Sequence, residues 1–296
     1  MNERAVVLGK DSPLIGVITE PANLSAAADR PAVLIMNSGI IHRVGPGRGM
    51  VRLARDLAER GAVVARFDHS GIGDSPSRQD RTPWPRNTIL EAREVMDDLS
   101  QRYGCRHFIL MGICSGALTS FHVAREDPRV VGAVLMNSQG TEANADWQRT
   151  VKNREWARQY WTRSLFNADS WRRALAGKVQ YRRLLSVLGR QIRDRVAPSD
   201  AAITVTQSVW AQLHEMLQRG VQVMFVLSEG GHASDYFDVL MDGKIATLES
   251  TGCFHHVTLE RCDHTMTLLG NQHDLLQQVG TWMDQRWGQV APGNSV

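Results

Sequence analysis

The pentapeptide Gly-Ile-Cys-Ser-Gly at positions 112–116 is the stretch of this sequence whose residue types and spacing most directly suggest chemistry. A nucleophile flanked by a glycine two residues away on each side suits a sharp, strained turn between a strand and a helix. The flanking residues must be small, because neighbouring backbone presses on them. Cys114 has glycines at both places, whereas a nucleophilic Ser115 would put Ile113 and Ala117 there. The spacing therefore predicts Cys114 as the nucleophile.

A structural role for this cysteine is the alternative. Many cysteines are small, buried apolar residues, and glycine-rich junctions between strands and helices are common. The other three cysteines form no Cys-x-x-Cys pair with it or with each other, which argues against a zinc or thioredoxin-type site. Residues 1–20 carry charges where a secretory signal needs an apolar run, so we expect a cytoplasmic protein with reduced thiols. An attacking thiol needs this reducing environment.

Short apolar segments rich in β-branched residues alternate with segments that have apolar residues at helical spacing. This alternation predicts an α/β fold with a doubly wound, mostly parallel sheet of about eight strands. Strands are expected at 4–9, 14–20, 31–37, 62–68, 107–113, 130–138, 221–228 and 255–260. Helices are expected at 50–61, 87–104, 116–128, 205–220, 234–243 and 273–287. The predicted elements place residues 112–116 where a strand meets a helix.

The alternation stops near residue 140. We expect residues 1–140 and 206–296 to form one core, and residues 141–205 to form a helical insertion. The insertion interleaves tryptophans, Trp156 among them, with many arginines. One interpretation is a surface that meets acidic groups, such as the phosphate of a pantetheine arm or an acidic carrier protein. The alternative is an ordinary solvated helical pair whose tryptophans pack on the core.

Three segments resemble the α/β-hydrolase fold superfamily. The segment RFDHSGIGDS (66–75) resembles its DxRGxGxS turn, and LERCDHTMT (259–267) resembles its last strand and the Asp-His loop that carries the catalytic histidine. The segment NSGIIHRVGPGRGMVRLARDLAERG (37–61) resembles a bacterial subgroup with an HRVGP-like loop, whose members accompany polysaccharide-export or natural-product pathways. The resemblance implies that the insertion is a lid, and that nucleophile, acid and histidine follow in this order.

The resemblance implies His264 as the base; the alternative is an ordinary histidine of a surface loop. The acid would follow the strand at 221–228, where Gly230–Gly231 stands in place of the usual Gly-Asp. Asp235 and Glu229 are the candidates. Asp235 also fits an N-terminal helix residue stabilised by the helix dipole. A third alternative has no acid at all, because a thiol ionises more readily than an alcohol and needs less help from its base.

The backbone N–H groups of Ile40 and Ser115 are the expected donors to a developing oxyanion, with Gly39 allowing close approach. His42, beside this loop, is expected to contact substrate, as are Gly39, Arg43 and Trp156. The expected chemistry is attack on an ester or thioester through an acyl-cysteine, followed by hydrolysis or by transfer to an amine or alcohol. The expected partner is a small or carrier-bound acyl substrate.

The composition narrows the remaining classes of function. The net charge of +3 is too small for a dedicated nucleic-acid binder, and no apolar run is long enough to span a membrane. We expect no cofactor and no metal. The sequence leaves the oligomeric state open, and a homodimer is one of the alternatives. The alternative function is that of a non-catalytic relative of the α/β-hydrolases that binds a small molecule or a partner protein.

Overall fold

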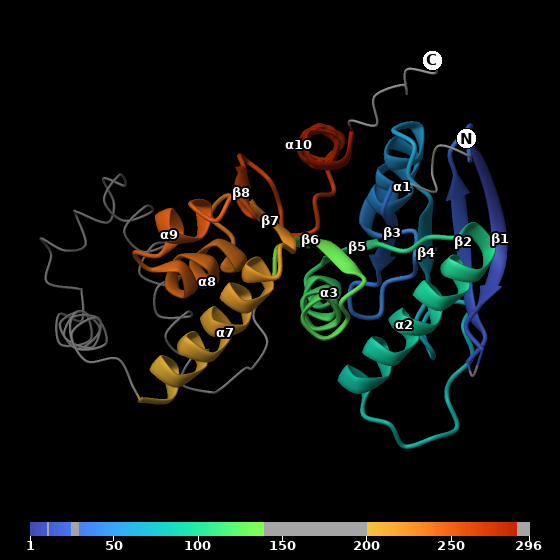
Figure 1. Cartoon of the computed structure of the whole chain (residues 1–296), viewed down its shortest axis with the longest axis horizontal. Helices are drawn as coiled ribbons and strands as arrows, with labels where there is room; N and C mark the ends of the chain where they lie inside the picture. Colours follow the sequence, from blue (N-terminus) through green and yellow to red (C-terminus); the bar gives the residue numbers. More distant parts are fainter. Residues whose placement is uncertain (11, 25–29, 139–199, 289–296) are drawn as a thin grey trace, which may run out of the picture.

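The computed structural model describes residues 1–10, 12–24, 30–138 and 200–288, with backbone alone for residues 200–207 (Figure 1). The described chain forms one sheet of eight strands in the order β1-β2-β4-β3-β5-β6-β7-β8. Strands β1, β2 and β4 pair antiparallel, and every other pair is parallel. The strands are β1 (Asn2–Leu8), β2 (Leu14–Glu20), β3 (Ala32–Met36), β4 (Val64–Phe67), β5 (Phe108–Ile113), β6 (Val130–Met136), β7 (Gln222–Ser228) and β8 (Phe254–Leu259). The prediction of a mostly parallel sheet of about eight strands is confirmed.

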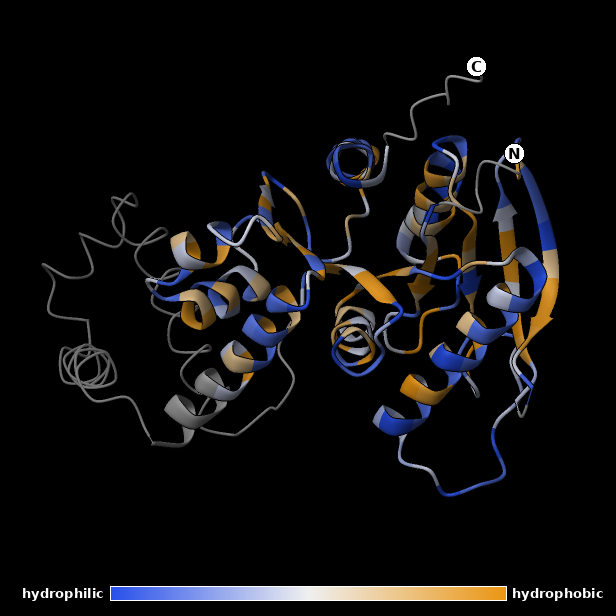
Figure 2. Cartoon of the chain, viewed as in Figure 1, coloured by the Kyte–Doolittle hydropathy of each residue, from blue (hydrophilic) through white to orange (hydrophobic). Residues whose placement is uncertain are grey.

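Helices cover both faces of this sheet (Figure 1), and apolar and polar residues mix along the helices, whereas the central strands are mostly apolar (Figure 2). Helices α1 and α10 contribute to one buried cluster, and α2, α3, α7 and α8 contribute to the other. The helices are α1 (Gly49–Glu59), α2 (Trp84–Tyr103), α3 (Ser115–Glu126), α7 (Asp200–Gln218), α8 (His232–Met241), α9 (Ile245–Glu249) and α10 (Leu269–Trp287). Alternate residues of β3 enter opposite clusters, because side chains point to opposite faces along a strand. This two-sided burial explains why β3 reads as a continuous apolar run.

Most elements lie within a few residues of their predicted ranges. Helix α2 begins three residues earlier than predicted, at Trp84, where Pro83 and Pro85 suit a helix start. The short helix α9 was not predicted, because five residues are too few to show helical periodicity. No helix in the described part of the chain has the length and apolar character to span a membrane. The predicted lid lies almost entirely outside the described residues, as does Trp156.

The parallel strands bring six chain segments to one edge of the sheet. Their carboxyl ends lead into the segments after β3, β4, β5, β6, β7 and β8, and all candidate catalytic residues outside the insertion lie in or next to these segments. Ligands in open α/β sheets bind at this edge. The topology therefore collects residues from positions 37 to 264 in one region.

The glycines of residues 112–116 let β5 and α3 meet closely. A Cβ atom on Gly112 would lie 2.3 Å from the carbonyl carbon of Gly116, and one on Gly116 would lie 2.5 Å from the carbonyl oxygen of Asn37. Cys114 takes φ 58° and ψ −116° between them. The steric argument that selects Cys114 as the turn residue is therefore supported by the backbone itself.

Replacing Gly112 with alanine tests this packing. We expect the free energy of unfolding to fall by about 1–3 kcal/mol, the usual cost of overpacking, because the added methyl meets backbone that cannot move aside. Gly270→Ala is the matched control, since a Cβ there meets nothing within 4 Å and the variant should be no less stable than the wild type. Denaturant unfolding of the three proteins measures both effects. Equal stability of Gly112→Ala and wild type would contradict the packing argument.

Candidate functional site

The candidate nucleophile sits at the tip of the turn between β5 and α3. Cys114 is half-buried and is the N-cap residue of α3, which begins at Ser115. The backbone N–H of Cys114 donates to the carbonyl oxygen of Met136, the last residue of β6, at 2.9 Å. The positive φ of Cys114 is unusual for a residue with a side chain, and such strain concentrates at functional turns.

The loop that carries His264 is fixed to the next residue along β6. The side-chain amide of Asn137 donates to the carbonyl oxygen of His264 at 2.8 Å and to the hydroxyl of Ser228 at 2.7 Å. That hydroxyl in turn donates to the carbonyl oxygen of Asp263 at 2.9 Å. Asn137 is fully buried, with φ 46°. Consecutive residues at the end of β6 thus hold the turn of Cys114 and the histidine loop.

The imidazole of His264 is suited to accept a proton. It is half-buried, and this burial lowers its pKa, with a further lowering from the nearby His232 at the start of α8. The carboxylate of Asp263 acts in the opposite direction, with a smaller effect. A lowered pKa keeps the ring neutral near pH 7, as a general base requires.

The two candidate reacting groups are not joined by a hydrogen bond. Within the part of the chain that the structure describes, no residue hydrogen-bonds the imidazole of His264 or the sulfur of Cys114. Catalytic hydrogen bonds are often long or poorly aligned before substrate binds. The structure therefore brings both segments to one edge of the sheet without pairing the two side chains.

Asp263, next to the histidine, has a local task. Its carboxylate accepts hydrogen bonds from the N–H and hydroxyl groups of both Thr265 and Thr267, at 2.6–3.0 Å. These bonds hold its pKa well below the ordinary value against the opposing effect of burial. The carboxylate thus shapes its own loop and is not available as a partner for the ring of His264.

The two predicted acids occupy different environments. Glu229 is exposed and accepts a hydrogen bond from the backbone N–H of Arg261 at 3.0 Å. Asp235 is buried in the first turn of α8. Neither carboxylate is among the groups that shift the pKa of His264. The assignment of the acid stays a prediction.

The predicted oxyanion loop approaches the start of α3 through a side chain. The backbone N–H of Gly39 donates to the hydroxyl of Ser115 at 2.6 Å. A hydrogen bond from the N–H of Ile41 to the carbonyl of Ser38 closes a turn across Gly39 and Ile40, and the side chain of Ile40 is 92% exposed. The N–H that faces α3 therefore belongs to Gly39, one residue before the predicted donor.

Known proteins share this architecture. A sequence model of the alpha/beta hydrolase fold matches residues 32–177. Solved structures similar over nearly the whole chain include an esterase from Pyrococcus furiosus, 11% identical, with a TM-score of 0.59 and coverage of 97% of this chain and 91% of that one. The chain has the α/β-hydrolase fold. A proline iminopeptidase from Mycobacterium smegmatis is 17% identical, with a TM-score of 0.56 and coverage of 97% and 99%.

A third α/β-hydrolase, GrgF from Penicillium, is 15% identical, with a TM-score of 0.57 and coverage of 98% of this chain and 100% of that one. A search of curated protein sequences found no match. Likenesses at this level of identity establish the fold. The chemistry of this chain has to be argued from its own residues.

The DxRGxGxS segment departs from the α/β-hydrolase pattern at Ser70, which stands at the arginine position. Arg43 supplies a guanidinium here instead: its Nη1 bonds Asp68, and also bonds Asp74 at 2.8 Å and His42 Nε2 at 2.7 Å. This contact lowers the pKa of Asp74. Two of the four predicted substrate contacts, His42 and Arg43, thus belong to an ion-pair cluster beside the predicted oxyanion loop.

The same cluster is the candidate metal site among the described residues. The ligand atoms of His42, Asp68 and Asp74 lie within 4.8 Å of one another. The guanidinium of Arg43, however, contacts all three groups and already supplies the positive charge. These residues therefore do not fit a metal centre.

Sequence reasoning missed Asn137, which fixes the histidine loop, and the hydroxyl of Ser115. The sequence held a sign of the first: β3 and β6 each end at a methionine, Met36 and Met136, and each is followed by Asn-Ser. A polar residue directly after a buried strand lies at the carboxyl edge of a parallel sheet, where sites form. No sequence signal indicated that the hydroxyl of Ser115 would meet Gly39.

Replacing His232 with glutamine tests the electrostatics of the histidine loop. The variant removes one cause of the lowered pKa of His264, so this pKa should rise toward the ordinary value of about 6.5. In the wild type, the neutral ring contributes full stability above that ordinary value, and the contribution is lost as the pH falls through the lowered pKa. Titration of the imidazole resonances by NMR measures the shift. Replacing the exposed His273 with glutamine is the control, and an unchanged His264 titration in His232→Gln would contradict the argument.

Proposed function

We propose that this protein is an acyl-transfer enzyme that acts on an ester or thioester through an acyl intermediate on Cys114. The observation that carries the proposal is the double anchoring at the end of β6. Met136 accepts the backbone hydrogen bond of Cys114, and Asn137 holds the carbonyl of His264. A strained turn bearing a thiol and a loop bearing a half-buried imidazole of lowered pKa are thereby held on adjoining residues, which supports nucleophilic catalysis.

The chemistry proceeds in two halves. The imidazole of His264 takes the proton of the Cys114 thiol while the sulfur forms a bond to the substrate carbonyl carbon. The tetrahedral intermediate then collapses, and the leaving alcohol or thiol departs with the proton from His264. A thioester remains on Cys114. Water, an amine or an alcohol next attacks this thioester and gives its proton to His264. The C–S bond then breaks, the sulfur takes that proton back from His264 as the free thiol, and the acid, amide or ester is released.

Backbone N–H groups would stabilise the oxyanion that forms in each half. The N–H of Ser115, at the start of α3, is one donor, and the loop after β3 supplies the other through Gly39 or Ile40. The hydroxyl of Ser115 accepts a hydrogen bond from the backbone N–H of Gly39, and this bond keeps the N–H of Gly39 directed toward α3. A hydroxyl can also donate, so it can turn toward the oxyanion once substrate arrives.

The proposal also covers the acyl acceptor and the acid that orients His264. An acyl-cysteine reacts readily with amines, so transfer competes with hydrolysis, and the substrate is a small or carrier-bound acyl compound. Asp235 is the favoured orienting acid because it is buried on the helix whose first residue, His232, influences His264. Glu229 is the alternative. The similar structures that are named esterase and iminopeptidase support acyl chemistry on this fold.

A non-catalytic binding role is the second candidate. The observation that favours it is the imidazole of His264, which has no hydrogen bond to Asp235, Glu229 or any other described residue. A relative that had lost catalysis would keep the fold and the strained turn without an aligned base. Thiol reactivity separates the two candidates.

The enzyme proposal predicts that Cys114 is the fastest-reacting of the four cysteines. Iodoacetamide should label Cys114 at least tenfold faster than Cys105, Cys253 or Cys262, and His264→Ala should remove this advantage, because the imidazole no longer takes the proton. Peptide mass spectrometry over a time course measures each site. His273→Ala controls for the loss of a histidine elsewhere. Equally slow labelling at all four sites would favour the binding role.

The hydroxyl of Ser115 gives a kinetic prediction. We expect Ser115→Ala to lower kcat for an aryl ester by about tenfold to a hundredfold with little change in KM, because a hydrogen bond to a charged oxygen contributes about 1.5–3 kcal/mol. Ser115→Thr, which keeps the hydroxyl, should retain most of the activity. Steady-state kinetics of the three proteins provide the comparison. A change in KM alone would assign the hydroxyl to substrate binding.

A further inference from the structure

The second half of the HRVGP-like segment lies against the loop of His264 and the start of α10. Residues Pro46–Arg48 form a short 3-10 helix, in which Gly47 takes φ 52°. A Cβ atom on Gly47 would lie 2.9 Å from the side-chain nitrogen of Gln272 and 3.3 Å from the carbonyl oxygen of Thr267. A glycine at position 47 therefore permits both this backbone conformation and the close approach of the two segments.

The buried side chain of Gln272 joins these segments. Gln272 lies near the start of α10 and is 2% exposed. Its amide nitrogen donates to the carbonyl oxygen of Met266 at 3.0 Å and to that of Gly47 at 3.4 Å. Its amide oxygen accepts a hydrogen bond from Nη1 of Arg52, on α1, and the same Nη1 donates to the carbonyl oxygen of Gly47 at 3.1 Å. The nitrogen and the oxygen of this buried amide thus both have partners, as burial of a polar group requires.

Gln272 attaches the histidine loop at a point beyond His264. Asn137 holds the carbonyl of His264 itself, from the end of β6. Gln272 holds the carbonyl of Met266, two residues further along the chain, from α10. None of the described side chains hydrogen-bonds the imidazole ring, so the direction of the ring depends on the backbone that carries it. A loop attached at one point can pivot, whereas attachment at two points fixes the backbone between them.

We propose that Gln272 is a positioning residue for His264, an inference that rests on the acyl-transfer function proposed above. Arg52 and the backbone of Gly47 hold the glutamine in place. The second half of the HRVGP-like segment then serves the base, while the first half, through Arg43, belongs to the ion-pair cluster. The amide acts through the backbone of the loop and touches no reacting atom. Its loss should therefore slow proton transfer and leave substrate binding unchanged.

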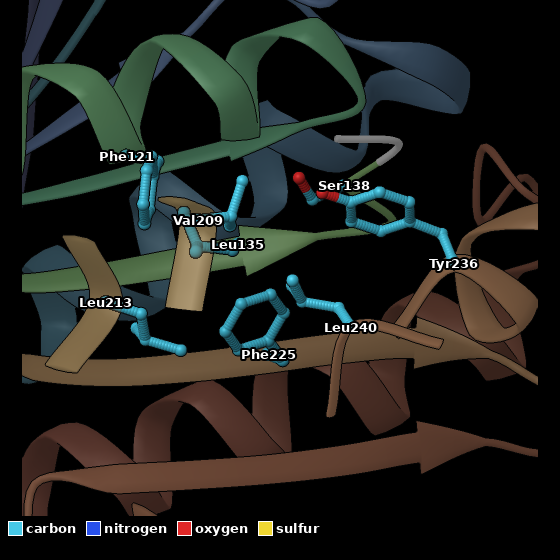
Figure 3. A pocket seen from close by; sticks show the side chains of 8 residues that line it. All are labelled: Phe121, Leu135, Ser138, Val209, Leu213, Phe225, Tyr236 and Leu240. Carbon is cyan, nitrogen blue, oxygen red and sulfur yellow. The ribbon is translucent and has the colours of Figure 1, made fainter. Parts of the chain in front are cut away.

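The apolar pocket between α3, α7 and α8 is built from the other side of the sheet. Figure 3 shows the side chains that line it, which are Phe121, Leu135, Ser138, Val209, Leu213, Phe225, Tyr236 and Leu240. Seven of these eight belong to the buried cluster of α2, α3, α7 and α8, whereas Met266 belongs to the cluster of α1 and α10. We therefore expect a substitution at Gln272 to leave the walls of this pocket unchanged.

Steady-state kinetics with an aryl ester and hydrogen exchange of backbone amides test the proposal. Gln272→Leu should lower kcat about tenfold to a hundredfold, because a small displacement of a reacting group has effects of this size. KM should stay within about twofold of the wild type. The amides of Met266 and Thr267 should exchange at least about tenfold faster, since the loop opens more easily. Gln277→Leu, which changes an exposed glutamine of the same helix, should match the wild type in both measurements.

Two further sets of variants keep the shape of the side chains and change their hydrogen bonds. Arg52→Met removes the donor to Gln272 and should lower kcat in the same way, whereas Arg52→Lys keeps a cationic donor and should restore most of the activity. Gln272→Glu keeps the size of the glutamine, but its carboxylate has no N–H for the carbonyl of Met266. It should therefore behave like Gln272→Leu, and it replaces that variant if the leucine prevents folding.

The exchange measurement needs no turnover, so it separates failure of this proposal from failure of the proposed function. If Cys114→Ala or His264→Ala keeps full esterase activity, the acyl-cysteine chemistry is wrong, while faster exchange confined to the histidine loop of Gln272→Leu still supports the hold on that loop. If turnover depends on Cys114 and His264 but Gln272→Leu matches the wild type in kcat and exchange, the positioning role is overturned. Exchange that accelerates equally throughout β8 and α10, or a change in KM alone, also overturns it.

Discussion

The buried amide of Asn137 is the contact on which the rest of the candidate site depends. Its oxygen accepts the N–H of Ser228 at 2.8 Å, and its nitrogen donates to the hydroxyl of Ser228 and to the carbonyl of His264. These bonds join the ends of β6 and β7 to the loop after β8. A buried amide without hydrogen-bond partners costs stability, so separating any one of the three segments from Asn137 is unfavourable. The backbone at His264 is thus held by residues at the ends of β6 and β7, in addition to contacts within its own loop.

A second asparagine has the equivalent task on the other side of Cys114. The amide of Asn37, at the end of β3, accepts the N–H of His69 at 2.7 Å and donates to the carbonyl of Ile41 and the carboxylate of Asp68. Gly116 packs against the carbonyl oxygen of the same residue. The oxyanion loop is therefore fastened both to β4 and to the start of α3. The turn of Cys114 lies between β3 and β6, and an asparagine directly follows each of these strands. Asn37 holds the predicted oxyanion loop and Asn137 holds the loop of His264, the two loops that the proposed chemistry uses.

The sequence was enough to predict features that depend on interactions between residues close together in the chain. Buried strands read as apolar runs, and the packing of Gly112 against Gly116, four residues apart, selects Cys114 without knowledge of the rest of the fold. Contacts across long sequence separations could not be predicted. The hydroxyl of Ser115 meets an N–H 76 residues away, and Asn137 meets the carbonyl of His264 127 residues away. Such contacts depend on which strands are neighbours in the sheet, and the periodicity of apolar residues does not specify the strand order.

Among the described residues no carboxylate hydrogen-bonds the ring of His264, and this bears on the choice of nucleophile. An alcohol must lose its proton to the base during attack, so an alcohol-based site depends on an acid that orients and charges the imidazole. A thiol ionises far more readily, and its reaction depends less on that acid. In the proposed mechanism, a half-buried imidazole with a lowered pKa, in a loop fixed through Asn137, meets this smaller demand. The cysteine at position 114 and a ring at position 264 that no described carboxylate hydrogen-bonds are therefore consistent parts of the proposed arrangement.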